Sequence, residues 1–174
     1  MKKILILTFL FLIVLSCEKI DDLTKFQLQY ETNFIIPDNI PEDTLVHLQE
    51  TTLSILPDDF QDNNTSKDLL EEVILKKITV NLDDANENFD FIKNLAIYIA
   101  ADDLPKVRIA WKNSIPDGEG NSLELDTLQD NILAYFKKES IKVFIDVETE
   151  QATDHNIPAT AVFDFEINAK ILGN

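Results

Sequence analysis

The stretch ATAVFDFEINAKI, residues 159–171, decides the fold. Every second residue in it is apolar, and most of the residues between them are polar or charged. This period of two is typical of a strand that turns one face to a core and the other to water. The sequence therefore predicts a strand whose core face carries Ala161, Phe163, Phe165, Ile167, Ala169 and Ile171.

The same alternation recurs along the chain in FQLQYETNF (26–34), ITVNL (78–82) and IKVFIDVET (141–149). LAIYIAA (95–101) and VRIAW (107–111) flank an acidic turn and predict a hairpin. The strands at 141–149 and 159–171 are joined by a polar loop and are also predicted to pair. Trp111 is in phase with Val107 and Ile109, which favours a place in the core over a sugar-stacking role.

Helical patterns are fewer. Thr65 or Ser66 can cap KDLLEEVILKK (67–77), and Asp126 can cap TLQDNILAYFKK (127–138). ENFDFIKN (87–94) predicts one short helical turn, and residues 42–56 fit either a strand or an extended loop. With three glycines in the chain, the turns must depend on Asn, Asp and Pro.

These patterns predict a mainly β fold: an antiparallel β-sandwich, immunoglobulin-like or similar, of about six to eight strands with two or three short helices. Residues 25–174 are expected to form it as a single domain, since their number suits one core.

The charge excludes one class of partner. The chain has 15 basic and 32 acidic residues, for a formal net charge of −17. Such a chain repels phosphate backbones, so we expect no nucleic-acid partner. It also repels anionic membrane surfaces, so any membrane attachment has to come from a lipid.

The N-terminus has the layout of a secretory signal. Two lysines precede an apolar run from Ile4 to Leu15, which is too short to span a bilayer. The run ends at Val14-Leu15-Ser16-Cys17, which holds the only cysteine of the chain. We predict that residues 1–16 are a signal peptide and that residues 17–24 are an acidic tether.

Val14-Leu15-Ser16-Cys17 resembles the lipobox of bacterial lipoproteins. The resemblance implies cleavage before Cys17 and acylation of Cys17, a palmitate-type anchor in the outer membrane. The acidic stretch 18–22 is similar to the surface-export signal of Bacteroidota lipoproteins, so the protein is expected to face the cell surface or the periplasm. NNTSKDLLEE (63–72) and NFDFIKNLAIYIAADDLPKVRIA (88–110) resemble uncharacterised lipoproteins of that group, which implies no activity.

Residues that could carry chemistry are sparse, and we expect no cofactor. His47 and His155 lie in polar or mixed segments outside any nucleophile or zinc motif, and we interpret both as surface residues. An acidic loop offers a weak calcium pattern at alternate positions: Asp84, Asn86, Asn88 and Asp90. It lacks the glycine and the glutamate that an EF-hand requires, so a solvated loop is the default.

Two threonines are candidates for O-glycosylation. Asp43-Thr44-Leu45 and Asp126-Thr127-Leu128 resemble the acceptor motif of exported Bacteroidota proteins. The expectation is weaker for Thr127 because helix capping by Asp126 already explains the second motif.

Three hypotheses about function stay open. The first is a non-enzymatic, lipid-anchored module that binds a protein or glycan partner, for which a flat sheet face with exposed aromatic side chains would be evidence. The second is an accessory hydrolase or carbohydrate-active protein, for which a cleft with a histidine beside two carboxylates would be evidence. The third is a structural subunit of an envelope complex, which would show a large exposed apolar patch.

Overall fold

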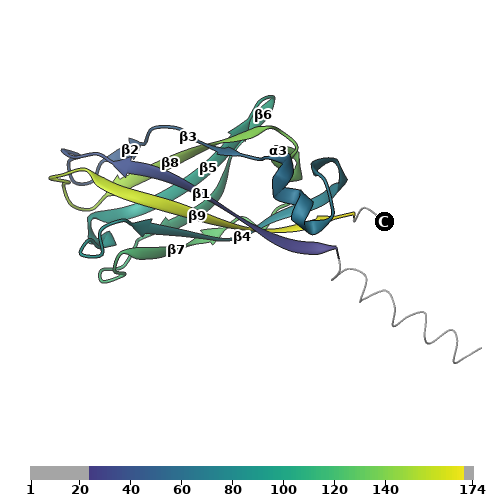
Figure 1. Ribbon diagram of the computed structural model, residues 1–174. Coiled ribbons are helices and arrows are strands. Elements are labelled where there is room, and N and C mark those ends of the chain that lie inside the picture. The colour runs from purple at the N-terminus through teal and green to yellow at the C-terminus, as the bar shows by residue number, and fades with distance from the viewer. Residues whose placement is uncertain (1–23, 171–174) are drawn as a thin grey trace, which may run out of the picture.

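The structure is a computed structural model that describes residues 24–170. It is an antiparallel β-sandwich, as predicted, with nine strands in the described range (Figure 1). The strands are β1 (Lys25–Ile36), β2 (Leu45–His47), β3 (Thr51–Ser54), β4 (Leu70–Leu82), β5 (Ile92–Ala101), β6 (Leu104–Asn113), β7 (Ser122–Thr127), β8 (Ser140–Thr149) and β9 (Ile157–Ala169).

The strands form two layers that β7 connects. Sheet A has the order β1-β9-β4-β7, and sheet B contains β6, β5 and β8, with both β2 and β3 paired to the outer edge of β8. β7 pairs with β4 over four residues and with β6 at Ala110 and Trp111, so the sheet curls from one layer into the other.

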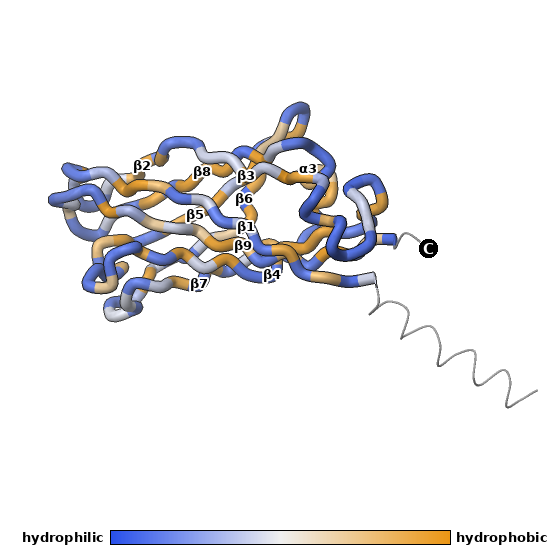
Figure 2. Tube along the Cα trace, viewed as in Figure 1, coloured by the Kyte–Doolittle hydropathy of each residue, from blue (hydrophilic) through white to orange (hydrophobic). Residues whose placement is uncertain are grey.

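The core lies between the two layers. On β9 the odd-numbered residues from Ile157 to Ala169 are buried, which confirms the predicted core face up to the end of the described range. The alternation is visible as changing hydropathy along the strands in Figure 2. Phe163 stacks on Phe165 with ring centroids 6.2 Å apart, and Phe136 meets Phe165 edge-on at 4.7 Å. Burial of each such side chain stabilises the fold by about 1.5–3 kcal/mol.

One predicted pairing is wrong. β8 and β9 do not pair with each other, because β8 belongs to sheet B and β9 belongs to sheet A. Each strand has one fully apolar face, and two such faces bury each other best from opposite layers. The polar loop 150–156 therefore crosses between the sheets. The predicted hairpin of β5 and β6 is confirmed.

The helix predicted over 67–77 is also wrong. Only a short 3₁₀ segment, η2 (Lys67–Leu69), is present there, and the rest is β4. β4 has register shifts between Leu70 and Glu72 and between Leu75 and Lys77. These bulges bury Leu70, Val73, Leu75 and Ile78, at steps of three, two and three. Such spacing imitates the period of a helix, which explains the misinterpretation.

The second predicted helix is much shorter than 127–138. Asp126 lies inside β7 and caps nothing, and the helix α3 is limited to Leu133–Phe136. The N-cap residue is Ile132, which makes no side-chain cap, and the preceding Asn131 accepts hydrogen bonds at Oδ1 from the amides of Leu133 and Val73. The expected turn within 87–94 is a 3₁₀ segment, η3 (Phe89–Phe91), and another, η1 (Pro57–Asn63), follows β3. Residues 42–56 contain the short strands β2 and β3.

The turns confirm the expectation that Asn and Asp take over from glycine. Asn39, Asp43, Asn64 and Asp103 all have positive φ angles between 50° and 63°. These side chains tolerate the left-handed region better than most others.

Four connections gather at one end of the sandwich, which we call the loop end: residues 37–44, 83–91, 114–121 and 150–156 (Figure 1). β1 begins at the opposite end, where Lys25 is paired with Asn168, and reaches the loop end at Ile36. Twelve strand residues span about 40 Å. No helix within residues 24–170 is long and apolar enough to cross a membrane.

Candidate functional site

The sequence-predicted residues do not converge on one site, although Asp84 and His155 lie beside the same hollow at the loop end. Cys17 lies outside the described residues. Thr127 is the last residue of β7, and its Oγ1 accepts a hydrogen bond from Gln129 Nε2 at 2.6 Å. Thr44 lies in the loop before β2, and its hydroxyl donates to the carbonyl of Glu42 at 3.1 Å. Glycosylation of either threonine stays a prediction.

Three residues of the calcium pattern, Asp84, Asn88 and Asp90, each have one side-chain oxygen engaged by a nitrogen of the protein. Asp84 Oδ1 accepts hydrogen bonds from the backbone and side-chain nitrogens of Asn86, and these bonds hold the pKa of Asp84 below its usual range. Asn88 Oδ1 accepts from the amide of Asp90, and Asp90 Oδ1 accepts from the amide of Gly118. Gly118 can take this place at φ 84° without strain. Residues 24–170 contain no cluster of three or more His, Cys, Asp or Glu placed to hold a metal.

The loop end is strongly acidic. Its four connections carry eleven carboxylates and no lysine or arginine: Asp38, Glu42, Asp43, Asp83, Asp84, Glu87, Asp90, Asp117, Glu119, Glu150 and Asp154. Lys93 of β5 compensates part of this charge, with Nζ 2.9 Å from Asp43 and 3.6 Å from Glu148. The hydrogen bond to Asp43 raises the pKa of Lys93.

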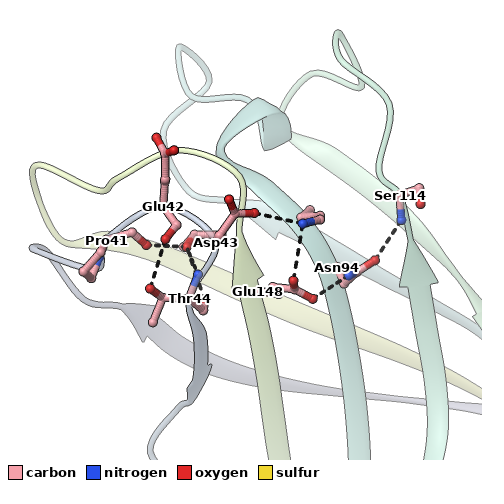
Figure 3. A network of polar contacts seen from close by, with 9 residues as sticks. Pro41, Glu42, Asp43, Thr44, Asn94, Ser114 and Glu148 are labelled. Carbon is pink, nitrogen blue, oxygen red and sulfur yellow. Dashed lines mark hydrogen bonds and ion pairs between the residues drawn. The ribbon is translucent and has the colours of Figure 1, made fainter.

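A chain of polar contacts continues across β5 from this lysine (Figure 3). Glu148 accepts from Asn94 Nδ2 at 2.6 Å, and Asn94 Oδ1 accepts from the amide of Ser114 at 2.8 Å. These contacts join Asp43 of the first loop and Ser114 of the third loop to β5 and β8 of sheet B. Ser114 has a positive φ of 51°, and the amide held by Asn94 helps to fix that conformation.

His155 links two other loops at this end. Its Nδ1 lies 2.6 Å from Asp154 and its Nε2 lies 2.9 Å from Glu87 of the β4–β5 connection. Hydrogen bonds to Asp154 and then Glu87 raise the pKa of His155. Beside it is an open hollow of about 480 Å³ lined by Asp83, Asp84, Ala85, Glu87, Asn156, Ile157 and Pro158.

This group is the arrangement of a histidine with two carboxylates that a hydrolase would need, but its geometry favours another role. Both ring nitrogens of His155 are within hydrogen-bond distance of carboxylates, and these contacts raise its pKa. A general base needs one unprotonated nitrogen aimed at a nucleophile. The contacts therefore describe an ion-paired clasp between two loops.

The outer face of sheet B presents aromatic side chains. Tyr98 on β5 alternates with the buried Ile97 and Ile99 and is half-buried on this outer side. Phe144 on β8 is its direct cross-strand neighbour, and Arg108 on β6 is its neighbour on the other side.

Trp111 lies on this face as well, which contradicts its predicted place in the core. β6 has a bulge where Ile97 pairs with Ala110 and Tyr98 pairs with Arg108, so Ile109 is an extra residue. Ile109 and Ala110 are both buried in succession, and the alternation restarts one residue out of phase. Trp111 consequently shares the outer face with Arg108 and is half-buried.

Two cations lie over these rings. Lys106 Nζ is 4.5 Å from the ring centroid of Tyr98 and 4.4 Å from that of Phe144. Arg108 Cζ is 4.5 Å from the ring centroid of Trp111. We call these five residues the aromatic–cation cluster: Tyr98, Lys106, Arg108, Trp111 and Phe144. Sequence reasoning missed it because neither the bulge nor the cross-strand register can be seen in local alternation.

A row of cross-strand neighbours lies on the same face and includes Trp111 of the cluster. This row crosses five strands through the register pairs of Asp126, Trp111, Ala96, Asp146 and His47. His47 Nδ1 lies 2.7 Å from Asp146, and the Asp146 side chain is 13% exposed. Ala96, between Trp111 and Asp146, has the smallest side chain of the row, so the surface of the sheet is recessed at that position.

Comparisons with known proteins assign no family. No protein-family model matches the chain, and no curated protein matches its sequence. The fold is similar to a decameric BFDV capsid protein, with a TM-score of 0.44 and 8% identity over 84% of this chain and 98% of that chain. It is also similar to the infectious bursal disease virus Gt strain structure, with a TM-score of 0.37 and 12% identity over 83% of this chain and 32% of that chain.

A third similar structure contains carbohydrate-binding modules of the β-sandwich superfamily. The TM-score is 0.32 and the identity is 10%, over 87% of this chain and 57% of that chain.

Proposed function

We propose that the protein is a lipoprotein anchored in a bacterial outer membrane through Cys17, and that it is a non-enzymatic module that binds a partner through the outer face of sheet B. The support for the anchor is the resemblance of Val14-Leu15-Ser16-Cys17 to a lipobox. Two or three acyl chains on one cysteine are enough for stable attachment.

The direction of β1 fits such an anchor. The tether at residues 17–24 leads into β1 at the end of the sandwich opposite the loop end. Along β1, the loop end lies about 40 Å from Lys25, the strand residue nearest to Cys17 in the sequence. The outer face of sheet B lies along the side of the sandwich, between the end where β1 begins and the loop end.

The single observation that carries the binding role is the aromatic–cation cluster. Trp, Tyr and Arg are the residue types that contribute most binding energy at interfaces. Here they lie together on the outer face of sheet B, where each side chain of the cluster is half-buried or exposed. Trp111 and Arg108 lie on the side of the sheet that faces away from the core, where a partner could contact them.

Site-specific photo-crosslinking in intact envelopes tests this role. A benzophenone-bearing phenylalanine analogue replaces Tyr98 in one variant and Val162 in a matched control. Val162 is half-buried on the outer side of sheet A, alternating with buried residues of β9. We expect an adduct of defined mass from position 98 that disappears when Arg108→Ala is added. The proposal fails if position 98 gives no adduct, or gives the same adducts as position 162.

A hydrolase is the second candidate, since His155, Glu87 and Asp154 lie beside a hollow. Both ring nitrogens of His155 already contact carboxylates, which disfavours this role. His155→Gln should leave partner binding through sheet B unchanged, whereas a hydrolase would lose its reaction with that substitution.

A further inference from the structure

We infer that the aromatic–cation cluster binds an acidic segment of a partner protein, through carboxylates that contact Arg108 and Lys106. This inference rests on the proposed function and names the chemistry of its partner.

The first argument is that these two cations lack acidic partners in a chain rich in acids. Carboxylates outnumber bases by 32 to 15 in the sequence. Five of the described lysines form ion pairs with carboxylates: Lys76, Lys77, Lys93, Lys142 and Lys170. Within residues 24–170, five others besides Lys106 form none: Lys25, Lys67, Lys112, Lys137 and Lys138. Among residues 24–170, no carboxylate oxygen lies within 4.0 Å of Arg108 or Lys106.

Two of the neighbouring acids on the same face are engaged, whereas Asp126, beside Trp111, has no side-chain partner among the described residues. Asp146 is paired with His47, and Glu148 is contacted by Asn94 and Lys93. The positive groups in the middle of the face are left to meet an external anion. Charge complementarity then selects an acidic partner, because like charges placed opposite each other would be rejected.

The second argument is that the cations are held in place before a partner arrives. Arg108 lies over the Trp111 ring, and Lys106 lies over two rings at once. Long side chains that are already ordered lose less conformational entropy on binding. The guanidinium remains able to donate two parallel hydrogen bonds to one carboxylate.

The third argument separates a peptide from a sugar. A sugar ring that stacks on an aromatic side chain needs an open ring face. Arg108 and Lys106 lie over faces of all three rings of the cluster. Carboxylates on flexible Asp or Glu stems can reach the two cations without displacing them, so the observations favour an acidic polypeptide over a glycan.

Binding of the mature lipidated protein in detergent to three polymers tests the inference. The probes are poly-L-glutamate, polygalacturonate as an acidic glycan, and dextran as a neutral one. We expect poly-L-glutamate to bind most tightly and to weaken as sodium chloride is raised, because the contacts are ionic and exposed. Arg108→Ala and Lys106→Ala should each weaken it by about tenfold or more, the range of a lost charge-assisted contact.

Matched variants control the result. Lys76→Ala removes a lysine from sheet A that is paired with Glu166, and it should leave binding unchanged. Arg108→Lys keeps the charge but loses the planar fork, so its affinity should fall between the native chain and Arg108→Ala. Melting curves of all variants check that each is folded.

Several outcomes overturn the inference. No binding of poly-L-glutamate overturns it, as does binding that Arg108→Ala and Lys106→Ala leave unchanged. Polygalacturonate bound at least as tightly identifies an acidic glycan instead, and dextran binding that needs Trp111 but not Arg108 identifies sugar stacking. The crosslink from position 98 is independent of these probes: if it persists while poly-L-glutamate fails, the partner chemistry is wrong and the binding face stands.

Discussion

Arg108, the only arginine of the chain, lies over Trp111, the only tryptophan, with its Cζ atom 4.5 Å from the ring centroid. The pair exists because a single extra residue in β6 turns Trp111 to the side of the sheet that Arg108 occupies. The arrangement of Arg108 over Trp111 on the outer face of sheet B depends on that bulge.

The first prediction concerns the strength of this pair. A double-mutant cycle of Arg108→Ala and Trp111→Ala should give a coupling free energy of about 0.5–1 kcal/mol, the range of an exposed cation–π contact. Urea unfolding followed by far-ultraviolet circular dichroism measures it. The same cycle with Lys76→Ala and Trp111→Ala should give no coupling, and equal values for the two cycles would contradict the contact.

The second prediction compares the stability cost of a Phe→Ala substitution in the core with that of one on the outer face of sheet B. Phe163→Ala should lower the free energy of unfolding by about 3–5 kcal/mol, because Phe163 is fully buried and its removal leaves a cavity. Phe144→Ala removes a half-buried ring from the outer face and should cost about 1 kcal/mol, chiefly the contact with Lys106. Equal losses would show that Phe144 belongs to the core.

The third prediction concerns the clasp at His155. Its pKa is raised in the folded state, so its contribution to stability is full below the unfolded pKa of about 6.5 and is lost as pH rises through the folded value. The pKa of Asp154 is lowered by the same hydrogen bond, so that contribution is lost as pH falls below about 4.

The clasp should therefore stabilise the protein most between about pH 4 and 6.5. Melting temperatures of the native chain and His155→Gln at pH 6 and pH 8 measure this window. We expect the difference between the two proteins to be larger at pH 6. A difference that is the same at both pH values would show that the His155 contacts add nothing to stability.

The fourth prediction concerns repulsion at the loop end. Raising sodium chloride from low concentration to about 0.1 M at pH 7 shortens the screening length to about 10 Å and should raise the melting temperature. Asp117→Asn with Glu119→Gln, two loop-end acids with no side-chain partner among the described residues, should raise it at low salt and reduce the salt effect. Glu166→Gln, which breaks a pair with Lys76, is the control and should not stabilise.

The fifth prediction concerns the anchor. Cys17→Ala should accumulate as an uncleaved precursor that takes up no label from a palmitate analogue, because the cysteine sulfur is the group that accepts the lipid. Gel mobility, label uptake and membrane fractionation measure it against the native chain. Normal processing and membrane retention of the variant would refute the lipoprotein hypothesis.

The strands whose side chains alternate without a break, and the hairpin marked by an acidic turn, could be predicted from the sequence. β9 and β8 alternate strictly, and the β5–β6 hairpin is marked by an acidic turn, so their faces follow from neighbouring residues alone. The sandwich class follows for the same reason, since strands with one apolar face have to bury it against another layer. The loops built on Asn and Asp were predictable from the scarcity of glycine.

What only the tertiary structure decided is the phase and partnership of those strands. The bulges of β4 made a strand imitate a helix, and the bulge of β6 moved Trp111 out of the core. The crossing from β8 to β9 placed His155 beside Glu87, 68 residues away. Whether a strand contains a bulge, or whether a loop crosses from one sheet to the other, depends on which distant strand supplies the hydrogen bonds. Residue periodicity contains information only about neighbours along the chain. The binding face and the clasp were therefore beyond the reach of the sequence, while the sandwich that holds them was not.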